Sequence, residues 1–498
     1  MKEKQANIFY RPYTCGPAGV PMEDNRIRKH PVLEFERGEE IYFEFEGERV
    51  KAYPGETIAA ALYANGLVKF TESKRHHRPR GFFCAIGKCS SCIMRVDGVP
   101  HVRTCTTPAE DGMKVERHGA LPEFPKDVPP NSPRPLERDI DVAIVGGGPA
   151  GLSGAIVAAN HGLDVHVFDE GNHQGGQLVK QTHQFFGSHR EEAGTRGIDL
   201  AVELKEEAHK AGVHIHGGST VLGYYPDMTL TVEHENKLEI YRAKAMAYCT
   251  GAVENYLAFE NNDLPGIYGA GGVQTLMNEY GIIPGKRVLM IGSGNVGLIV
   301  SYQLLQAGVD VVEVIEAMPH FGGYQVHASK LRRAGVPIRT RHTIKRALGT
   351  EQVTGAVVHE LDEHWQPIPG TERELECDVI CIAVGLHPDN QFLRQAGAEM
   401  KYVRELGGYV PVRTPDMETT VEGIYVAGDA AGIEEATVAA LEGKLVGYAV
   451  AERLLGGSEE ITMKKEGVQK SIEGMRQGPY GEYPRRGVKM CTLEEEVC

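Results

Sequence analysis

Alternating apolar and polar residues in segment 38–52 predict two short strands around a turn at Gly47. A helical pattern begins after Thr57, whose hydroxyl can cap the first turn of that helix. A strand pair and a helix in so short a stretch indicate a small N-terminal domain. We expect this domain to cover residues 38–120.

A longer pattern starts with the apolar run 141–145, which predicts a buried strand. The glycine-rich turn 146–151 follows, then a helix of small residues over 152–161 and a second strand over 165–168. Strand, G-x-G-x-x-G, helix, strand and acid form the complete context of a dinucleotide site, in which the glycines admit a pyrophosphate. The residues that carry this pattern are Gly146, Gly148, Gly151 and Asp169.

The same order of elements recurs further along the chain. Strand 287–291 leads into the turn 292–297, and a strand over 311–315 ends beside an acid. Two complete patterns predict two Rossmann-type domains and two nucleotide sites. The alternative for the second is a domain that keeps the fold but has lost its ligand. The residues of this second site are Gly292, Gly294, Asn295, Gly297 and Glu316.

Segments rich in proline or polar residues separate these units. Residues 1–37 predict an N-terminal arm, 121–138 a Pro-rich linker and 457–498 a C-terminal tail. Between the second dinucleotide pattern and the tail, an apolar strand ends at Gly428-Asp429, and a helix is expected over 435–455.

The length of 498 residues suggests about three domains. The net charge of −15 argues against a nucleic-acid partner. Ten cysteines in so long a chain do not predict a disulfide framework, and the sequence shows neither a membrane-spanning apolar run nor an apolar leader. We therefore expect a protein of the reducing cytoplasm, without a transmembrane segment.

Four cysteines follow the spacing C-x4-C-x2-C-x12-C, at Cys84, Cys89, Cys92 and Cys105. The first three have the loop spacing of a plant-type [2Fe–2S] cluster, whose fourth thiolate comes from further along the chain. The alternatives are a zinc site or four incidental thiols, but zinc sites more often show two C-x2-C pairs, and only one pair here has that spacing. We therefore expect a [2Fe–2S] cluster, which transfers one electron at a time.

Together, the two glycine-rich patterns and the Gly-Asp strand end resemble the two-dinucleotide-binding flavoproteins, the class of glutathione and thioredoxin reductases. The resemblance implies FAD at the first site, with Asp429 on its ribityl chain. It also implies an FAD domain split over 139–255 and 371–456, around a nucleotide domain over 256–370. The further residues that it places at the FAD are Gly176, Gln177, Thr250, Gly251 and Gly428.

Glu316 bears on the choice of nucleotide at the second site. A carboxylate at this position hydrogen-bonds to a ribose 2′-hydroxyl and repels a 2′-phosphate, so we expect NAD rather than NADP. ATP would satisfy the same contacts, and both ligands stay open.

Disulfide reductases of this class carry a redox-active cysteine pair beside the flavin. Segment 175–187 contains no cysteine, and Cys377 and Cys381 lie in apolar sequence typical of buried thiols. Cys249 stands alone. Without a dithiol to take electrons from the flavin, the cluster is the expected acceptor.

The strand pair, helix and cysteine loop resemble a ferredoxin-type β-grasp domain, and its fusion to such a flavoprotein resembles a narrower group. Segments 78–87, 250–255 and 262–266 are similar to the α subunits of heterotetrameric sarcosine oxidase, of opine- and hydrogen-cyanide-synthase-type enzymes and of archaeal dye-linked L-proline dehydrogenase. The resemblance implies an amine-oxidising flavoprotein partner in a hetero-oligomer, proline-type substrates, and an FMN between the subunits.

Three further features have two interpretations each. The basic run 74–80 is either a docking face for a phosphate or an acidic partner, or a solvated patch. His183 is either a proton donor near the flavin or a packing residue. Cys491 and Cys498 form a C-x6-C pair that either ligates a metal with a partner's help or, as we expect, is not a metal site.

Three functions follow from these patterns. The first is the flavin and iron–sulfur electron-transfer subunit of an amine or imino-acid dehydrogenase complex. The second is a freestanding NADH:acceptor oxidoreductase. The third is a regulatory subunit whose second nucleotide site senses NAD or ATP.

Overall fold

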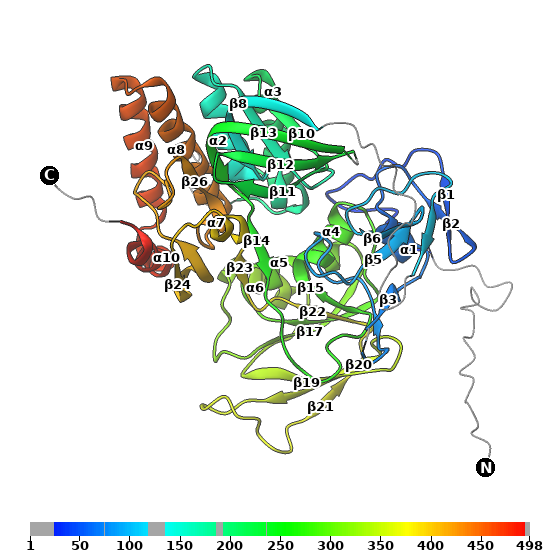
Figure 1. Ribbon diagram of the computed structural model, residues 1–498. Coiled ribbons are helices and arrows are strands. Elements are labelled where there is room, and N and C mark those ends of the chain that lie inside the picture. Colours follow the sequence, from blue (N-terminus) through cyan, green and yellow to red (C-terminus); the bar gives the residue numbers. More distant parts are fainter. Residues whose placement is uncertain (1–23, 74, 118–134, 186–192, 236, 494–498) are drawn as a thin grey trace, which may run out of the picture.

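A computed structural model describes residues 24–73, 75–117, 135–185, 193–235 and 237–493. Figure 1 shows a small N-terminal domain in blue, a large sheet with its helices in cyan and green, a second α/β domain in green and yellow, and C-terminal helices in orange and red. The predictions that concern residues 1–23, Lys74, most of the Pro-rich linker and Cys498 lie outside the described residues.

The N-terminal domain is built on a five-stranded sheet of order β2-β1-β7-β5-β6, in which only β1 and β7 run parallel. Helix α1 (Ile58–Ala64) is buried along its whole length, and Ala60 N donates to the Thr57 hydroxyl at 3.2 Å. The predicted strand pair, helix and cap are confirmed. The strands are β1 (Ile41–Phe45), β2 (Glu48–Ala52), β5 (Ile93–Val96), β6 (Val99–Arg103) and β7 (Lys114–Glu116), with a separate pair β3 (Thr71–Glu72) and β4 (Pro79–Arg80).

The described part of the predicted arm is anchored to two domains. The buried guanidinium of Arg26 donates to both carboxylate oxygens of Glu56 at 2.7 Å. The amide of Ile27 donates to the carbonyl of Gly281 in the second nucleotide domain at 2.6 Å. Residues from Arg26 onward therefore connect the N-terminal domain to its neighbour.

The first dinucleotide domain has a seven-stranded sheet in which β10, β9, β8, β13 and β26 run parallel and β12 and β11 extend it antiparallel. The first strand begins at Leu136, inside the segment predicted as linker. The strands are β8 (Leu136–Val145), β9 (Val165–Asp169), β10 (His214–Gly217), β11 (Ser219–Tyr225), β12 (Thr229–His234), β13 (Lys237–Tyr248) and β26 (Ile424–Val426).

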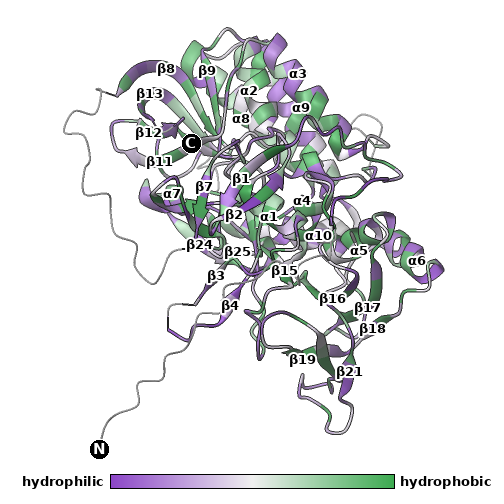
Figure 2. Ribbon diagram, turned by 90° about the vertical axis from the view of Figure 1, so that its right-hand side faces the viewer, coloured by the Kyte–Doolittle hydropathy of each residue, from purple (hydrophilic) through white to green (hydrophobic). Residues whose placement is uncertain are grey.

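Helices α2 (Pro149–Asn160) and α8 (Ala436–Leu455) pack closely against each other. A Cβ on Gly443 would lie 1.9 Å from the Ala150 carbonyl oxygen, so only glycine permits this approach. Helix α3 (Gly197–Lys210) lies nearby and carries both polar and apolar residues along its length (Figure 2), with Ala201, Leu204 and Ala208 buried. Helical spacing of its apolar residues thus places one face on the domain core.

The second dinucleotide domain has a five-stranded parallel sheet of order β15-β22-β16-β17-β18, beside a three-stranded antiparallel sheet β19-β20-β21. Its strands are β15 (Ile267–Gly269), β16 (Arg287–Ile291), β17 (Asp310–Glu316), β18 (Ile338–Thr340), β19 (His342–Leu348), β20 (Gly355–Glu360), β21 (Arg373–Leu375) and β22 (Val379–Ile382). Its helices are α4 (Ala270–Asn278), α5 (Asn295–Gln306) and α6 (Gln325–Arg333).

The boundary that the sequence places after residue 370 is wrong, because β21 and β22 pair with strands of the second domain. The chain crosses between the two domains through a strand pair, β14 (Ala252–Glu254) with β23 (Leu386–Pro388). The apolar run 379–382 fits a strand of either sheet equally well, and only its pairing decides where it belongs.

The predicted C-terminal tail is also wrong for its described residues, which form helices α9 (Glu459–Met475) and α10 (Gly478–Cys491). Helix α9 packs on α8 and is followed by Arg476, whose guanidinium binds the buried carboxylates of Glu434 at 2.6 Å and Glu442 at 2.8 Å. Helix α10 packs on β24 (Met400–Val403), which pairs with β25 (Gly408–Pro411). Between β23 and β24 lies the short helix α7 (Gln391–Gln395).

Among the described residues, no helix combines the length and the apolar character that crossing a membrane requires.

Candidate functional site

The register of three parallel strands brings the predicted FAD residues together. Tyr248 of β13 pairs with Val145 of β8 on one side and with Val426 of β26 on the other. The turn at Gly146, the pair Thr250-Gly251 and the pair Gly428-Asp429 follow these strand ends, so they meet at one edge of the sheet. In open parallel sheets, this carboxyl edge is where ligands bind.

Two kinds of glycine make up the first turn. Gly146 has φ +107°, and a Cβ there would lie 2.3 Å from the Cys249 carbonyl oxygen, so the fold itself requires glycine. Gly148 is different, because its φ is −80° and a Cβ would have only the Gly176 Cα within 4 Å, at 3.8 Å. The space over Gly148, at the amino end of α2, therefore fits a pyrophosphate.

Asp169 ends β9 and organises the loop around this space. Its carboxylate accepts hydrogen bonds from the amides of Gly147 at 2.6 Å and Gly171 at 2.7 Å. Burial raises the pKa of this carboxyl despite these bonds. The amide of Gly175 in turn donates to the Gly147 carbonyl at 2.8 Å, which sets Gly176 and Gln177 at the start of the 3-10 helix η1 (Gly176–Lys180) beside the turn.

Asp429 lies at the opposite side of the edge, in the 3-10 helix η4 (Gly428–Ala430). Desolvation raises its pKa to about 7, and Glu442, Glu434 and Glu435 repel its charge further. The preceding amide, of Gly428, donates to Glu442 at 3.0 Å. Glu442 is held by Arg476, so a helix that the sequence pattern missed supports this strand end.

We expect Asp429→Asn to stabilise the chain without FAD at alkaline pH and to weaken its affinity for FAD. Because the folded pKa of Asp429 lies above the ordinary value of 3.8, its protonated form favours folding at low pH, and that contribution is lost as the pH rises towards about 7. Thermal unfolding of the apo chain should therefore show a gain at both pH values that is larger, by about 1 kcal/mol, at about pH 8.5 than at about pH 6. The exposed Asp227→Asn is the control, and an equal gain at both pH values would contradict the assignment.

The second turn repeats the geometry of the first. Gly292 has φ +102°, and a Cβ there would lie 2.2 Å from the Ala383 carbonyl oxygen, whereas Gly294 has no atom within 4 Å of an added Cβ. Glu316 accepts hydrogen bonds from the amide and the hydroxyl of Ser293, at 2.9 and 2.7 Å. The space over Gly294 therefore fits a second pyrophosphate. Helix α5 packs closely against the turn at Gly297, because a Cβ added there would lie 2.2 Å from the Gly292 carbonyl oxygen.

A second glycine pair completes this site and was missed in the sequence. The amide of Gly323 donates to the Ser293 carbonyl at 2.8 Å, as Gly175 does to Gly147 in the first site. The neighbouring Tyr324 amide donates to the Asn295 side chain, also at 2.8 Å. The glycine pair 175–176 follows Asp169 in the pattern D-x5-G-G, and the pair 322–323 follows Glu316 in the pattern E-x5-G-G. This repeat was the signal by which the sequence could have revealed the second pair.

The side chains of the four cysteines of the N-terminal domain converge on one point of the loop. Cys84 lies within hydrogen-bonding reach of Cys105 and Cys89, and these bonds lower the pKa of Cys84. Cys92 likewise lies within reach of Cys105, which lowers the pKa of Cys92. The amide of Gly87 points at the Cys105 sulfur, 3.3 Å away. Four converging sulfurs in a largely buried loop fit an iron–sulfur cluster.

This cluster loop is seated against both dinucleotide domains. Lys88, between two of the cysteines, binds Glu170 and Asp389, each at 3.0 Å. Burial opposes the ammonium charge, but the two carboxylates raise the pKa of Lys88 overall. Glu170 directly follows Asp169, and the Asp389 amide donates to the Gly251 carbonyl at 3.0 Å. The loop therefore rests on the edge that carries the predicted FAD residues.

A second contact joins the loop to helix α4. A Cβ on Gly272 would lie 2.1 Å from the Phe83 carbonyl oxygen and 3.2 Å from the Cys84 carbonyl carbon. Phe83 also stacks on Tyr256, with ring centroids 4.8 Å apart and planes 11° from parallel. Neither contact could be predicted, because both depend on how separate domains meet.

Thiols outside the cluster loop show no redox-active pair among the described residues. Cys249, Cys377 and Cys381 are buried and free, and burial raises the pKa of Cys249 and of Cys377 to about 12. Cys491 is also buried, and the Arg413 guanidinium donates to its sulfur at 3.3 Å.

Two features with open interpretations, the basic run and His183, make contacts within the chain. Arg78 is engaged within the chain, at 2.6 Å from Asp263 and 2.9 Å from Asn261. His183 lies near His327 of α6, with ring centroids 6.3 Å apart, and burial lowers its pKa to about 4. Its ring also packs edge-on against Phe185, with centroids 5.8 Å apart, and its buried Nδ1 has no hydrogen-bond partner among the described residues, so these contacts fit packing better than proton donation.

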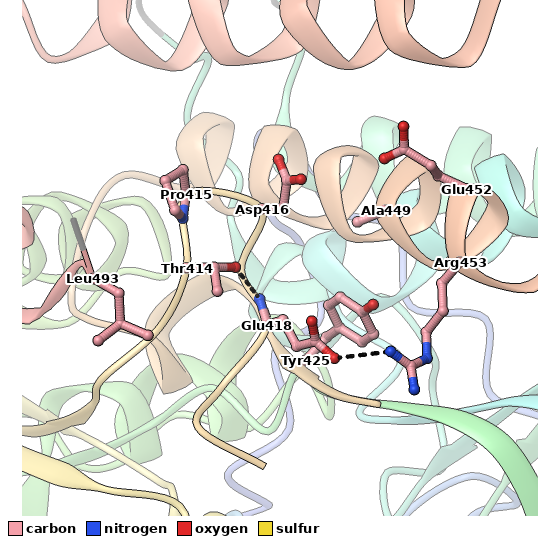
Figure 3. A pocket seen from close by; sticks show the side chains of 9 residues that line it. All are labelled: Thr414, Pro415, Asp416, Glu418, Tyr425, Ala449, Glu452, Arg453 and Leu493. Carbon is pink, nitrogen blue, oxygen red and sulfur yellow. Dashed lines mark hydrogen bonds and ion pairs between the residues drawn. The ribbon is translucent and has the colours of Figure 1, made fainter. Parts of the chain in front are cut away.

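Figure 3 shows a pocket of about 550 Å³ between the end of the FAD sheet and α8. Glu418, Tyr425 and Arg453 lie across it, and Arg453 pairs with Glu418 at 3.4 Å. None of its lining residues belongs to the glycine turns or to the cluster loop, so we do not assign it to the cofactors.

Two family models match the chain. Residues 140–443, more than half of the chain, match the pyridine nucleotide-disulphide oxidoreductases, and residues 38–119 match the 2Fe-2S iron-sulfur cluster binding domain. An opine oxidase subunit from Rhizobium meliloti (strain 1021) is 26% identical over 392 residues, which cover 72% of this chain and 83% of that protein.

Further relatives extend the match over most of the chain. The alpha subunit of sarcosine oxidase from Corynebacterium sp. (strain P-1) is 25% identical over 445 residues, covering 84% of this chain but only 44% of that protein. The crystal structure of L-proline dehydrogenase from P. horikoshii superposes with a TM-score of 0.69 and 27% identity, covering 89% of this chain and 79% of that one. The thioredoxin reductase of T. acidophilum shares the fold, with a TM-score of 0.53.

The predicted fold class and the resemblance to this group are confirmed, as are FAD and [2Fe–2S] as cofactors. With two glycine turns of the expected geometry and a cysteine loop seated beside the first, the chain belongs to the pyridine nucleotide-disulphide oxidoreductase family and is an FAD-dependent oxidoreductase with an N-terminal 2Fe–2S domain.

Proposed function

We propose that this chain is the electron-transfer subunit of an amine or imino-acid dehydrogenase complex, with a proline-type substrate. The observation that carries the proposal is the position of the cluster loop, in which Lys88 forms ion pairs with Glu170 and Asp389 beside the first glycine turn. Bound FAD accepts electrons in pairs, whereas a [2Fe–2S] cluster carries them singly. The chain's own residues hold the two centres at one sheet edge.

The residues proposed to hold the cofactors are those placed at the two turns and in the cysteine loop. Gly148 and Asp169 would bind the pyrophosphate and ribose of FAD, and Asp429 its ribityl chain. Gly294 and Glu316 would bind the second nucleotide, NAD(H) or ATP. The four cysteines, Cys84, Cys89, Cys92 and Cys105, would bind the cluster.

The names of the relatives support a partner subunit. The matched chains of opine oxidase and of sarcosine oxidase are each named as one subunit of their enzyme. A solved relative that covers most of the chain is an L-proline dehydrogenase, which supports proline-type substrates. The absence of a dithiol among the described residues fits the same proposal, since it leaves the cluster loop as the route for electrons.

We propose that the partner is a second flavoprotein subunit that oxidises the amine. It would dock on the part of the basic run that remains exposed, Arg75, His76, His77 and Arg80, since Arg78 is paired within the chain. The phosphate of an FMN between the subunits is one candidate for this surface. Docking of this kind weakens as salt screens the charges.

Co-purification from the native source tests the proposal. We expect a second flavoprotein to accompany the chain, and proline-dependent dye reduction to require both. The double variant Arg75→Glu and Arg80→Glu should reduce complex formation while FAD and iron contents stay unchanged. Lys470→Glu, an equally exposed charge on α9, is the matched control. Oxidation of proline by this chain alone at the rate of the native preparation would rule the proposal out.

The open space over Gly294 favours a second candidate, an NADH:acceptor oxidoreductase. The candidates differ in a direct observation: bleaching of the flavin by NADH in the isolated chain supports this one. Binding of ATP or NAD without bleaching supports a regulatory role for the second site.

We expect Glu316→Ala to weaken binding of NADH and ATP by about 1–3 kcal/mol, because a buried hydroxyl of the ligand loses its acceptor and Ser293 loses its anchor. NADPH should be weakened less, since a repulsive charge is removed at the same time. Titration of each nucleotide against the wild type, the variant and the exposed control Glu363→Ala measures this. Tighter binding of NADPH than NADH to the wild type would contradict the assignment.

A further inference from the structure

A cluster of histidines lies at the end of the FAD sheet opposite the cofactor edge. His166 of β9 and His214 of β10 are paired neighbours in the parallel register. Asp164 directly precedes β9, and its carboxylate oxygen lies 3.4 Å from His166 Nε2 and 3.6 Å from His214 Nε2. The three ligand atoms all lie within 4.8 Å of one another.

These distances match those of a metal centre. In a tetrahedral zinc site with bonds of about 2.0–2.1 Å, neighbouring ligand atoms are about 3.3 Å apart. The two aspartate–histidine distances, 3.4 and 3.6 Å, are close to that value, and the third distance, between the two histidines, is at most 4.8 Å. Two imidazoles and one carboxylate are ligands that zinc accepts, with a fourth position left for water.

Hydrogen bonds from neighbouring residues hold two of the three ligands, His166 and Asp164, in place. His166 Nδ1 lies 2.9 Å from His216 Nε2, so His166 can donate from Nδ1 and keep Nε2 free for a metal. The backbone of Asp164 is held by β8, because its amide donates to the Asp141 carboxylate at 2.9 Å and its carbonyl accepts from Val142 at 3.0 Å. Lys244 holds Asp141 in turn, at 2.8 Å.

The side chains differ in their exposure in a way that suits binding from solution. The His166 side chain is 4% exposed, while those of Asp164 and His214 are 45% and 60% exposed. One ligand is therefore fixed in the sheet and two lie open to solvent. Nothing in the proposed electron-transfer function uses these residues, and Asp169, at the FAD, stands at the other end of β9.

We propose that Asp164, His166 and His214 bind a divalent transition-metal ion, with Zn²⁺ as the ion that fits best. The bound ion joins the edge strand β10 to β9 and to Asp164, which directly precedes β9, and so stabilises the FAD sheet at the end opposite the cofactor edge. A water molecule completes the coordination on the open side.

Zinc titration of the full chain, loaded with FAD and cluster and first treated with a chelator, tests this. We expect one Zn²⁺ per chain, bound at least tenfold more weakly by His214→Ala and by Asp164→Asn. Both residues are exposed, so both variants should fold. His209→Ala, an exposed histidine on α3, should bind zinc like the wild type. Iron and FAD contents should be equal in all four proteins, which excludes binding at the cluster cysteines.

Thermal unfolding supplies a second readout. Zn²⁺ in excess should raise the unfolding midpoint of the wild type and of His209→Ala, because it binds the folded state, and should leave His214→Ala unchanged. Equal zinc affinity in the wild type and in His214→Ala, or no zinc binding by the wild type, would overturn the proposal.

Discussion

Gly148→Val is expected to abolish FAD binding while the chain still folds. The φ of −80° at Gly148 suits any L-residue, and an added Cβ would have only the Gly176 Cα within 4 Å, at 3.8 Å. It would instead fill the space over the amino end of α2, where the pyrophosphate is proposed to lie. Flavin absorbance of the purified variant, with circular dichroism as the measure of folding, checks this.

The matched variant is Gly294→Val, at the equivalent position of the second turn. Its φ is −66°, and an added Cβ has no neighbour within 4 Å. It should keep FAD and lose the second nucleotide. Equal loss of flavin from both variants would show that the two sites are not separate. Gly146→Val is unsuitable for comparison, since its Cβ would lie 2.3 Å from the Cys249 oxygen and would disturb the fold.

Cys89→Ser is expected to remove the iron–sulfur cluster and leave FAD bound. Cys89 is the most exposed of the four cysteines, so the change costs little packing, but a serine hydroxyl replaces a thiolate ligand. Visible absorbance beyond that of the flavin, and the EPR signal of the reduced protein, should largely disappear. Iron and acid-labile sulfide analysis gives the stoichiometry.

Cys377→Ala is the control, because Cys377 is a buried thiol outside the cluster loop. It should retain two irons and two sulfides per chain, as expected for this cluster type. Stoichiometric zinc without acid-labile sulfide in the wild type would show that the four cysteines form a zinc site instead. Loss of electron transfer to an external acceptor in Cys89→Ser, with FAD retained, would support the cluster as the outlet.

The sequence alone was sufficient to predict the two glycine turns, their acids and the cysteine loop. These features depend on local geometry. A positive φ at Gly146 and Gly292, a helix that starts directly after the turn, and a loop that brings Cys84, Cys89 and Cys92 close together all involve residues near one another in the chain. Such requirements leave a readable spacing, so the fold class could be predicted as well.

The tertiary structure alone decided how the pieces meet. The apolar strand at 379–382 joined the second domain rather than the first, because its neighbours β15 and β16 are there. The segment 457–493 formed two helices because α8 and β24 offer surfaces that cover them, and Arg476 found two buried carboxylates. Propensity and periodicity do not contain such information, since pairing and burial depend on distant residues.

At the site too, the sequence predicted the features that depend on neighbouring residues and missed those that depend on distant ones. The cysteines could be assigned, but not the anchor of their loop, because Lys88 meets Glu170 and Asp389 only when the N-terminal domain lies against the first dinucleotide domain. His166 and His214 likewise stand far apart in the sequence and become neighbours through strand pairing. Local spacing therefore determined which chemistry this chain carries, and long-range packing determined where each group acts, because contact energies reward proximity in space whatever the separation along the chain.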